Sequence, residues 1–154
     1  MKKRIYLIAG LGIIIDQITK IFANLYLKNI EIIPNFFNLT YVENTGGAWG
    51  IFDNNRVLLV GVSVITLLII NKYINSEVKI SKLSSISYGL LLGGIFGNLF
   101  DRIFRGFVVD FLNFTICGYD FPVFNIADSL IIIGIILMII ELIGGNYGSK
   151  SNKK

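Results

Sequence analysis

The chain has 154 residues, of which 54% are hydrophobic and only 16% are charged, and its mean hydropathy is +0.71. A soluble globular domain cannot bury this much apolar surface, and roughly a quarter of the residues in such a domain are charged. Disorder is also excluded, because disordered chains combine low hydrophobicity with high net charge. The length allows a single domain.

The scarcity of chemically active side chains narrows the kinds of site. The sequence has no histidine and one cysteine, Cys117, which excludes histidine-based triads, intrachain disulfides and cysteine-rich metal clusters. Acid–base chemistry must therefore rest mainly on Asp or Glu, and we expect no metal and no cofactor. We expect Cys117 to be a small buried apolar residue. The net charge of +4 fits membrane topology better than nucleic-acid binding, because the basic residues lie at the termini and in one short connection.

Four apolar segments are long enough to cross a bilayer, for which a helix needs about 20 mostly apolar residues. Between and after them we expect two outer connections and a polar tail. Along residues 37–42, every second side chain is aromatic or aliphatic, which fits a short half-buried strand and a surface loop equally well. The expected spans are 5–27, 57–74, 83–104 and 121–143, the connections are 28–56 and 105–120, and the tail is 144–154.

Positive charges predict the orientation of the spans. Basic residues cluster at positions 2–4, at 72, 79 and 82, and at 150, 153 and 154, and four spans bring all three clusters to one side. Lys and Arg favour the cytoplasmic side, so we expect both termini there and most acidic residues in the outer half. The basic start resembles a signal peptide but lacks a small-residue cleavage site, so we expect an uncleaved first span.

Ionisable residues inside apolar spans cost at least about 2.5 kcal/mol each, so they usually have a reason to be there. Asp16 and Lys20 lie four residues apart in the first span and share one helix face. A structural ion pair and a functional role are both open for them. In the third span, small residues recur every four positions from Ser81 to Gly97, which favours the close approach of another helix.

Polar residues gather where the third and fourth spans reach the outer side. Asn98, Asp101 and Arg102 have the spacing i, i+3, i+4 and form one cluster. Arg102 is either a structural partner of Asp101 or a donor to a substrate carbonyl. Asn125 and Asp128 likewise share one face at the start of the fourth span.

A second carboxylate, Asp110, precedes Asp128 across a turn-like segment at 117–120, which can bring the two together. In such a pair, the ionised group activates a water while the protonated group polarises a scissile carbonyl. The same pair could serve as a cation or proton site in a transporter, but spans two and four have few polar residues toward the inner side. A non-catalytic assembly factor would leave both carboxyls unexplained.

Five blocks of sequence carry a family resemblance. In chain order they are 16–20 (DQITK), 44–50 (NTGGAWG), 94–102 (GIFGNLFDR), 106–111 (GFVVDF) and 124–129 (FNIADS). Together they resemble the motifs of lipoprotein signal peptidase (signal peptidase II), a bacterial membrane aspartyl protease family. Each block alone is weak, but five in family order over nearly the whole chain are specific.

The resemblance implies an all-α polytopic membrane protein with four transmembrane helices, a small extracytoplasmic β-like cradle and a loop helix. It implies an aspartic endopeptidase that removes the signal peptide from diacylglyceryl-modified prolipoproteins, cutting just before the lipidated cysteine. The expected location is the bacterial cytoplasmic membrane, with the active site near the extracytoplasmic face. The expected partners are those precursors, membrane lipids and globomycin-type cyclic peptide inhibitors, and no nucleic acid.

The resemblance also assigns roles to residues by position. The catalytic pair falls on Asp110 and Asp128. Gly47 and Ile95 stand where the family usually has Ala, and Gly47 makes the loop beside the site more flexible. Substrate-binding positions fall on Asn44, Gly46, Asn98, Arg102, Asn125 and Ala127, and supporting positions fall on Asp16, Lys20 and Asp101.

Overall fold

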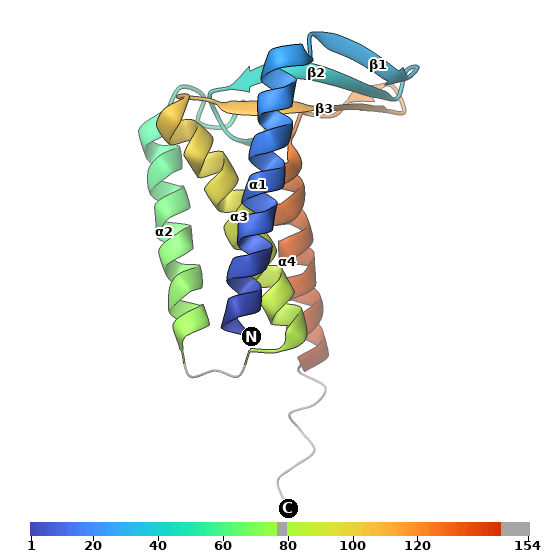
Figure 1. The fold of residues 1–154 in the computed structure, drawn as a ribbon. Helices are drawn as coiled ribbons and strands as arrows, with labels where there is room; N and C mark the ends of the chain where they lie inside the picture. The colour runs from blue at the N-terminus through green and yellow to red at the C-terminus, as the bar shows by residue number, and fades with distance from the viewer. Residues whose placement is uncertain (77–79, 146–154) are drawn as a thin grey trace, which may run out of the picture.

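Four long helices form a bundle in the computed structural model, which describes residues 1–76 and 80–145 (Figure 1). Each helix is long and apolar enough to cross a membrane, which confirms the predicted polytopic architecture. The N-terminus and the end of the last helix lie at the same end of the bundle. Lys79 and most of the predicted tail, from residue 146 on, lie outside the described residues. The helices are α1 (Lys2–Tyr26), α2 (Arg56–Asn75), α3 (Lys82–Phe104) and α4 (Ile126–Gly145).

The last helix begins later than the expected span 121–143, because the residues before Ile126 are extended. The backbone of Phe124 pairs with that of Leu112, with N–H···O distances of 2.8 and 3.1 Å. Asn125 then caps the helix, since its side-chain oxygen accepts the backbone N–H of Asp128 at 2.9 Å. Hydropathy alone does not separate an apolar extended segment from an apolar helix, so the predicted start was wrong.

Helix α3 stands at the centre of the bundle and contacts the other three helices. Its small residues allow this close packing, as the four-residue spacing predicted for the side that meets α1. A Cβ added at Gly93 would lie 3.1 Å from the carbonyl oxygen of Ala9, and one at Gly89 would lie 2.7 Å from Cβ of Ile8. On the side that faces α4, a Cβ at Gly94 would overlap the carbonyl oxygen of Ala127.

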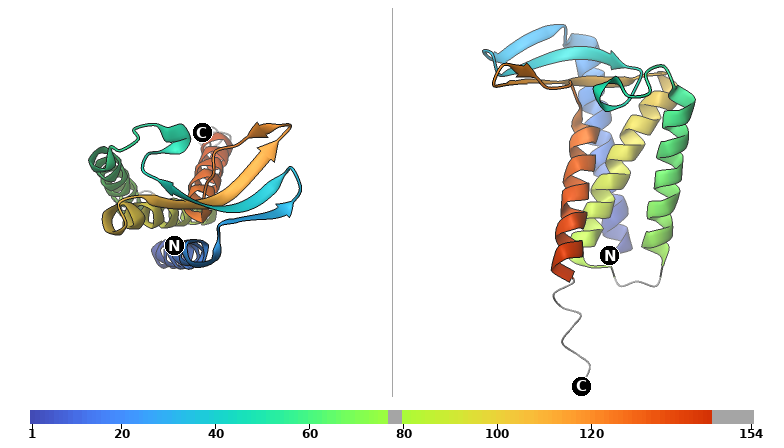
Figure 2. Two further views of the ribbon diagram at one scale, coloured as in Figure 1. Left: turned by 90° about the horizontal axis from the view of Figure 1, so that it is seen from above. Right: turned by 180° about the vertical axis from the view of Figure 1, so that it is seen from behind.

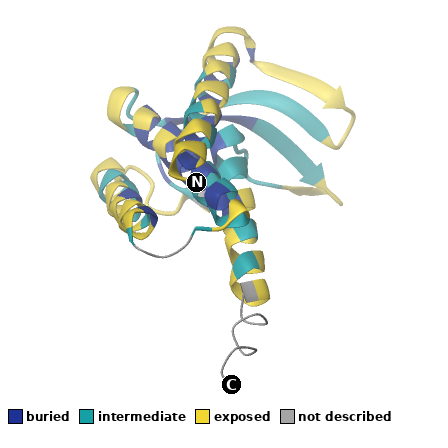
Figure 3. Ribbon diagram, turned by 60° about the horizontal axis from the view of Figure 1, so that its bottom comes forward, coloured by how far each residue is buried: buried dark blue, intermediate teal, exposed yellow. Residues whose placement is uncertain are grey.

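The outward faces of the helices are apolar. Figure 3 shows the buried residues gathered at the centre of the bundle and exposed residues along the outer faces of the helices. Many large aliphatic side chains are exposed there, among them Leu7, Ile14, Leu68 and Ile136. A water-soluble protein rarely exposes so extensive an apolar surface, whereas lipid tails solvate it without cost.

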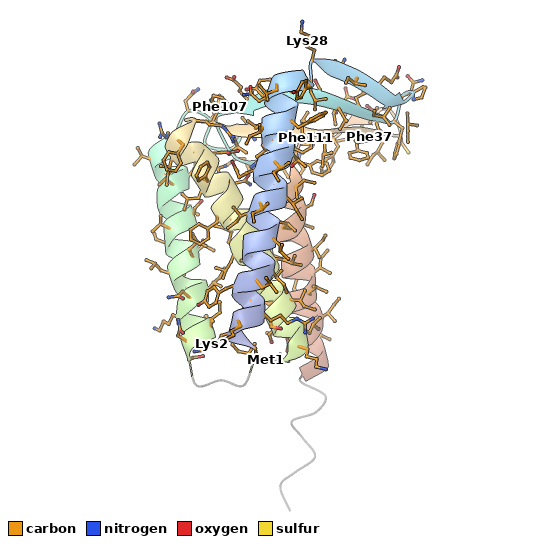
Figure 4. All side chains as sticks on the ribbon, viewed as in Figure 1. Met1, Lys2, Lys28, Phe37, Phe107 and Phe111 are labelled. Atoms are coloured by element: carbon orange, nitrogen blue, oxygen red, sulfur yellow. The ribbon has the colours of Figure 1, made fainter. Side chains whose placement is uncertain are left out.

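A four-stranded antiparallel sheet covers the end of the bundle opposite the N-terminus and extends beyond its side (Figures 1 and 2). The sheet packs on the end of α1, where Val109 and Phe111 meet Ala23 and Leu27; Figure 4 shows Phe111 beside that end of the helix. The alternation seen at 37–42 belongs to the second strand. In spatial order the strands are β1 (Asn29–Ile33), β2 (Phe37–Asn44), β3 (Val108–Ile116) and β4 (Tyr119–Asp120).

Two irregularities shape the sheet. Strand β2 contains a bulge, because its register against β3 passes from Leu39–Leu112 to Val42–Asp110 and so gains one residue. The β3–β4 hairpin turns at Cys117 and Gly118, whose φ angles are 52° and 78°, as a tight two-residue turn requires. Cys117 is exposed at this tip, so the prediction that it is buried was wrong.

Candidate active site

A pocket of about 260 Å³ lies where the sheet meets the bundle. Its walls come from the loop after β2, from α3, from β3 and from α4 with the extended segment before it. Trp49 and Phe121 form an apolar wall, with ring centroids 5.9 Å apart. Five of the predicted site residues line this one pocket: Asn44, Asn98, Arg102, Asp110 and Asp128.

Asp110 is carried by β3 and only 2% of its surface is exposed. Its Oδ2 accepts a hydrogen bond from Asn44 Nδ2 at 2.8 Å, and its Oδ1 accepts one from Asn125 Nδ2 at 2.6 Å. Burial, followed by repulsion from Asp128, raises the pKa of Asp110 to about 7, although both amide donors favour the ionised form. Asp110 therefore keeps a proton at pH values at which an ordinary aspartate is ionised.

Asp128 lies in the first turn of α4 and is half-buried. Its Oδ1 accepts a hydrogen bond from Asn98 Nδ2 at 2.7 Å, and its Oδ2 accepts one from the backbone N–H of Asn125 at 3.1 Å. Asn125 is fully buried and contacts both carboxyl groups, because its side chain bonds Asp110 and its backbone bonds Asp128. The two acids are thus held by one shared residue.

Arg102 links the pocket to the loop after β2. Its Nη2 donates to the carbonyl oxygen of Gly46 at 3.0 Å, and its buried Nε has no partner among the described residues. The side-chain oxygen of Asn44 accepts the Gly46 N–H at 2.9 Å, which fixes the amide nitrogen toward Asp110. Gly46 is buried, and an added Cβ would lie 3.2 Å from backbone atoms of Asp53, so a side chain there would require a small shift of the loop backbone.

A buried ion network lies directly behind the pocket. Lys20 Nζ is 2.9 Å from Asp16 and 2.9 Å from Asp101, and all three side chains are fully buried. Lys20 also donates to Asn98 Oδ1 at 2.8 Å. Asp16 accepts the backbone N–H of Ala127 at 2.9 Å, which ties α1 to the start of α4. The residues expected to support the site thus form one connected cluster.

Two members of this network were given no role from the sequence. Gln17 Nε2 lies 3.1 Å from both Asp16 Oδ2 and Asp101 Oδ1 and 3.2 Å from the Gly97 carbonyl oxygen. Arg105 forms an ion pair with Asp101, whereas Arg102, the partner considered from the sequence, donates to carbonyl groups instead. Their signals were a polar residue inside an apolar span and an i, i+4 spacing, respectively.

The cluster around the pocket carries almost balanced charge. Its four carboxyl groups and three basic groups sum to −1 when every group is ionised, so one added proton makes the cluster neutral. A single proton is what a pair of neighbouring carboxyls in a desolvated site retains. The acids are Asp16, Asp101, Asp110 and Asp128, and the bases are Lys20, Arg102 and Arg105.

Comparison with known proteins identifies the family. The family model described as signal peptidase (SPase) II matches residues 8–144 of this chain. The chain belongs to the signal peptidase II family. It is therefore a protease, and its four apolar helices embed it in a membrane.

Individual members of the signal peptidase II family and solved structures agree with this assignment. The chain is similar to a lipoprotein signal peptidase from Clostridium acetobutylicum, with 41% identity over 141 residues that cover 89% of this chain and 92% of the relative. It also resembles a bacterial membrane enzyme solved by the in meso method at 2.3 Å resolution, with a TM-score of 0.88, 36% identity and coverage of 100% and 94% of the two chains. A second such structure, at 1.9 Å resolution, has a TM-score of 0.81 and 38% identity, and the match covers 92% of this chain and 93% of the other.

Proposed function

We propose that this signal peptidase II is an aspartic endopeptidase that removes the signal peptide from diacylglyceryl-modified prolipoproteins, just before the lipidated cysteine. The observation that carries the proposal is the pair of carboxyls, Asp110 and Asp128, held by Asn125 in one pocket at the end of a membrane-embedded bundle. Among the described residues, no group of His, Cys, Asp and Glu side chains is arranged to hold a metal ion. We assign the chemistry to the paired acids because Asn125 holds both of them in the pocket.

In the proposed mechanism, Asp110 is the acid and Asp128 is the base. The raised pKa of Asp110 keeps its proton available for a hydrogen bond to the scissile carbonyl oxygen. Ionised Asp128, the more exposed of the two, takes a proton from a water molecule as the water oxygen attacks the carbonyl carbon. Asp110 protonates the carbonyl oxygen in the same step, which gives a neutral tetrahedral intermediate.

Breakdown of the intermediate restores both acids. The C–N bond breaks, and the departing amine takes the proton held by Asp128. Asp110 takes back a proton from a hydroxyl of the intermediate as the new carboxyl group forms. Asn98 and Asn125 keep the two carboxyl groups in place throughout. Asn125 donates a hydrogen bond to each carboxyl group, and Asn98 donates a second one to Asp128.

The remaining predicted site residues are proposed to bind the substrate or to support the site. Arg102 offers its unpartnered Nε–H to a substrate carbonyl, while Asn44 and Gly46 shape the adjoining loop. Ala127 positions the start of α4 through its bond to Asp16, and Lys20 and Asp101 hold the ion network. The apolar side chains of Ile131 and Ile132 continue the pocket along α4, where lipid-modified substrate would meet the bilayer.

We place the protein in the bacterial cytoplasmic membrane as one membrane domain over residues 1–154, with both termini in the cytoplasm. The cluster of basic residues at positions 2–4 supports this orientation. The pocket lies at the opposite end of the bundle, so we place it near the extracytoplasmic face. Globomycin-type cyclic peptides would then inhibit the enzyme by occupying the same pocket.

The test is a gel-shift cleavage assay with purified protein in detergent and a lipidated precursor. Asp110→Asn and Asp128→Asn are each expected to abolish cleavage. Asp120→Asn, at an exposed position in β4, is the matched control and should retain activity. A chelator should have no effect, and a globomycin-type peptide should block cleavage.

Three results would overturn the proposal. Full activity of a folded Asp110→Asn or Asp128→Asn variant, or loss of activity with a chelator, would contradict the paired-acid mechanism. Equal cleavage of a precursor without the diacylglyceryl group would contradict the assigned substrate class.

A further inference from the structure

A second cavity, of about 590 Å³, lies between α1, α2 and α3 and shares no lining residue with the active-site pocket. It exists because α2 packs chiefly against α3 and leaves a groove beside α1. Gly10 widens the groove, since a Cβ added there would meet no atom within 4 Å. The volume lies in the range of small-molecule sites in proteins, roughly 300–1,000 Å³.

The cavity is amphipathic along the axis of the bundle. Toward the middle of the bundle its walls are wholly apolar and include Ile13, Leu92 and Leu99. Toward the N-terminal end of α1, the two residues with polar side-chain atoms appear, Tyr6 and Asn71. The oxygen of Asn71 accepts a hydrogen bond from Asn75, while its side-chain nitrogen donates to no group among the described residues. One end of the cavity therefore suits a hydrocarbon chain and the other suits a polar headgroup.

Basic residues lie at the same end of the bundle as the polar end of the cavity, although none of them lines the cavity itself. Lys2, Lys3 and Arg4 begin α1, and Lys72 lies in the last turn of α2 directly after Asn71. Lys2 Nζ donates to Asn75 Oδ1 at 3.1 Å and so joins α1 to α2 at the mouth of the groove; Figure 4 shows Lys2 at this end of the bundle and Lys28 at the other. The ion pairs found among the described residues involve none of these four basic groups.

We propose that this groove between α1 and α2 binds one anionic phospholipid, with its phosphate near Lys2, Lys3 and Lys72 and an acyl chain in the apolar part. The orientation is that of a lipid in the leaflet on the side of the N-terminus. Basic pockets between transmembrane helices on the cytoplasmic side are suited to anionic headgroups. This inference is independent of the proposed cleavage reaction.

The charge arrangement selects this occupant over others. A signal helix is apolar in its core and carries basic residues at its start, which the four basic groups would repel. A zwitterionic phospholipid would gain the apolar contacts but carries no net negative charge for the basic cluster. An anionic lipid alone satisfies both ends of the cavity.

The test is native mass spectrometry of the purified protein with added dioleoylphosphatidylglycerol or dioleoylphosphatidylcholine. We expect the wild-type protein to retain one phosphatidylglycerol, bound at least about tenfold more tightly than phosphatidylcholine. Lys3→Gln combined with Lys72→Gln should remove this preference, whereas Lys28→Gln at the opposite end should preserve it. Gly10→Leu should fill the cavity and weaken both lipids, whereas Gly61→Leu, on an open face of α2, should weaken neither.

Cleavage of the lipidated precursor and circular dichroism check that each variant is folded. Equal binding of the two lipids by the wild-type protein, or unchanged lipid retention in Gly10→Leu, would overturn the proposal. Displacement of phosphatidylglycerol by a synthetic signal peptide would assign the cavity to the precursor and would also overturn it. None of these outcomes depends on whether Asp110 and Asp128 are catalytic.

Discussion

The side-chain oxygen of Asn98 accepts a hydrogen bond from the buried ammonium group of Lys20 at 2.8 Å. The nitrogen of the same amide donates to Asp128 at 2.7 Å. The amide cannot turn over without placing its NH₂ group against the ammonium and its oxygen against the carboxylate. Lys20 thus determines which atom of Asn98 faces Asp128, and the buried ion network reaches the proposed base through a single side chain.

Replacement of Lys20 should therefore be severe. Lys20→Met leaves Asp16 and Asp101 buried without their central cation, and breaking a buried pair in this way costs about 3–5 kcal/mol. We expect a large fall in the thermal unfolding temperature in detergent and loss of cleavage. Lys28→Met, at an exposed position just beyond α1, is the control. Wild-type stability in Lys20→Met would show that the network is not needed for the fold.

The pH dependence of cleavage should follow the proton on Asp110. Its pKa is raised from 3.8 to about 7, so the acid is protonated below that pH and ionised above it. Because only the protonated form donates to the scissile carbonyl, kcat/KM should fall as the pH rises through about 7, by about tenfold per pH unit beyond it. Initial rates with a lipidated precursor between pH 5 and 9 provide the measurement.

Asn44 offers a check on the sign of this effect. Its amide donates to Asp110 and lowers the pKa of that carboxyl, so Asn44→Ala should raise the pKa further. The alkaline limb of the rate profile should then move to higher pH, even where the maximal rate falls. Thr40→Ala on the same strand should leave the limb in place. A shift of the limb to lower pH in Asn44→Ala would contradict the assignment of the proton to Asp110.

Gly94→Ala should disturb both stability and activity, because its Cβ would overlap the carbonyl oxygen of Ala127. That oxygen belongs to backbone next to Asp128 and cannot swing away as the end of a side chain would. Overpacking of this kind costs about 1–3 kcal/mol, and the displaced start of α4 should also slow cleavage. Gly61→Ala, which meets no atom within 4 Å, should lower neither the unfolding temperature nor the cleavage rate. Equal behaviour of the two variants would refute the close α3–α4 contact.

Arg102→Lys keeps the positive charge but loses the planar set of donors. The guanidinium bonds the Gly46 carbonyl and retains an open Nε–H toward substrate, which one ammonium group cannot reproduce. We expect kcat/KM to fall by about tenfold, mainly through a higher KM. Arg56→Lys is the matched control, because Arg56 bonds the carbonyl of Ile103 and does not line the pocket. A similar loss in both variants would contradict a substrate-binding role of Arg102 and would indicate that each arginine acts only by bonding a backbone carbonyl group.

The ionisable residues were predictable because each one is costly in an apolar span. Asp16, Lys20 and Asp128 stood out for this reason, and the structure brings them into one cluster. Gln17 was harder to assign, because a neutral amide next to an acid gives no charge signal. The extended segment before Ile126 and the exposed position of Cys117 depend on the pairing of strands far apart in sequence, which local patterns do not contain.

The cavity beside Gly10 was likewise beyond prediction from sequence. It depends on how far α2 stands from α1, and that distance is determined by the packing of α2 on α3 rather than by any motif. The polar residues Asn71, Lys72 and Asn75 of α2 lie near its end, where polar side chains are usual, so they did not point to a cavity. A gap between helices of similar composition becomes visible only in the three-dimensional arrangement of the helices.

The bulge in β2 decides which side chain stands beside the proposed acid. It places Asn44 opposite Val108, and because paired residues share a face and neighbours along a strand alternate, Asn44 lies on the same face as Asp110. With the register of Leu39–Leu112 continued unbroken, Glu43 would take the place opposite Val108. The one extra residue in the bulge thus exchanges a negative neighbour for a neutral donor. In an unbroken register of the same sequence, Glu43 would be a third acid beside Asp110 and Asp128, and three carboxyls would compete for a single proton.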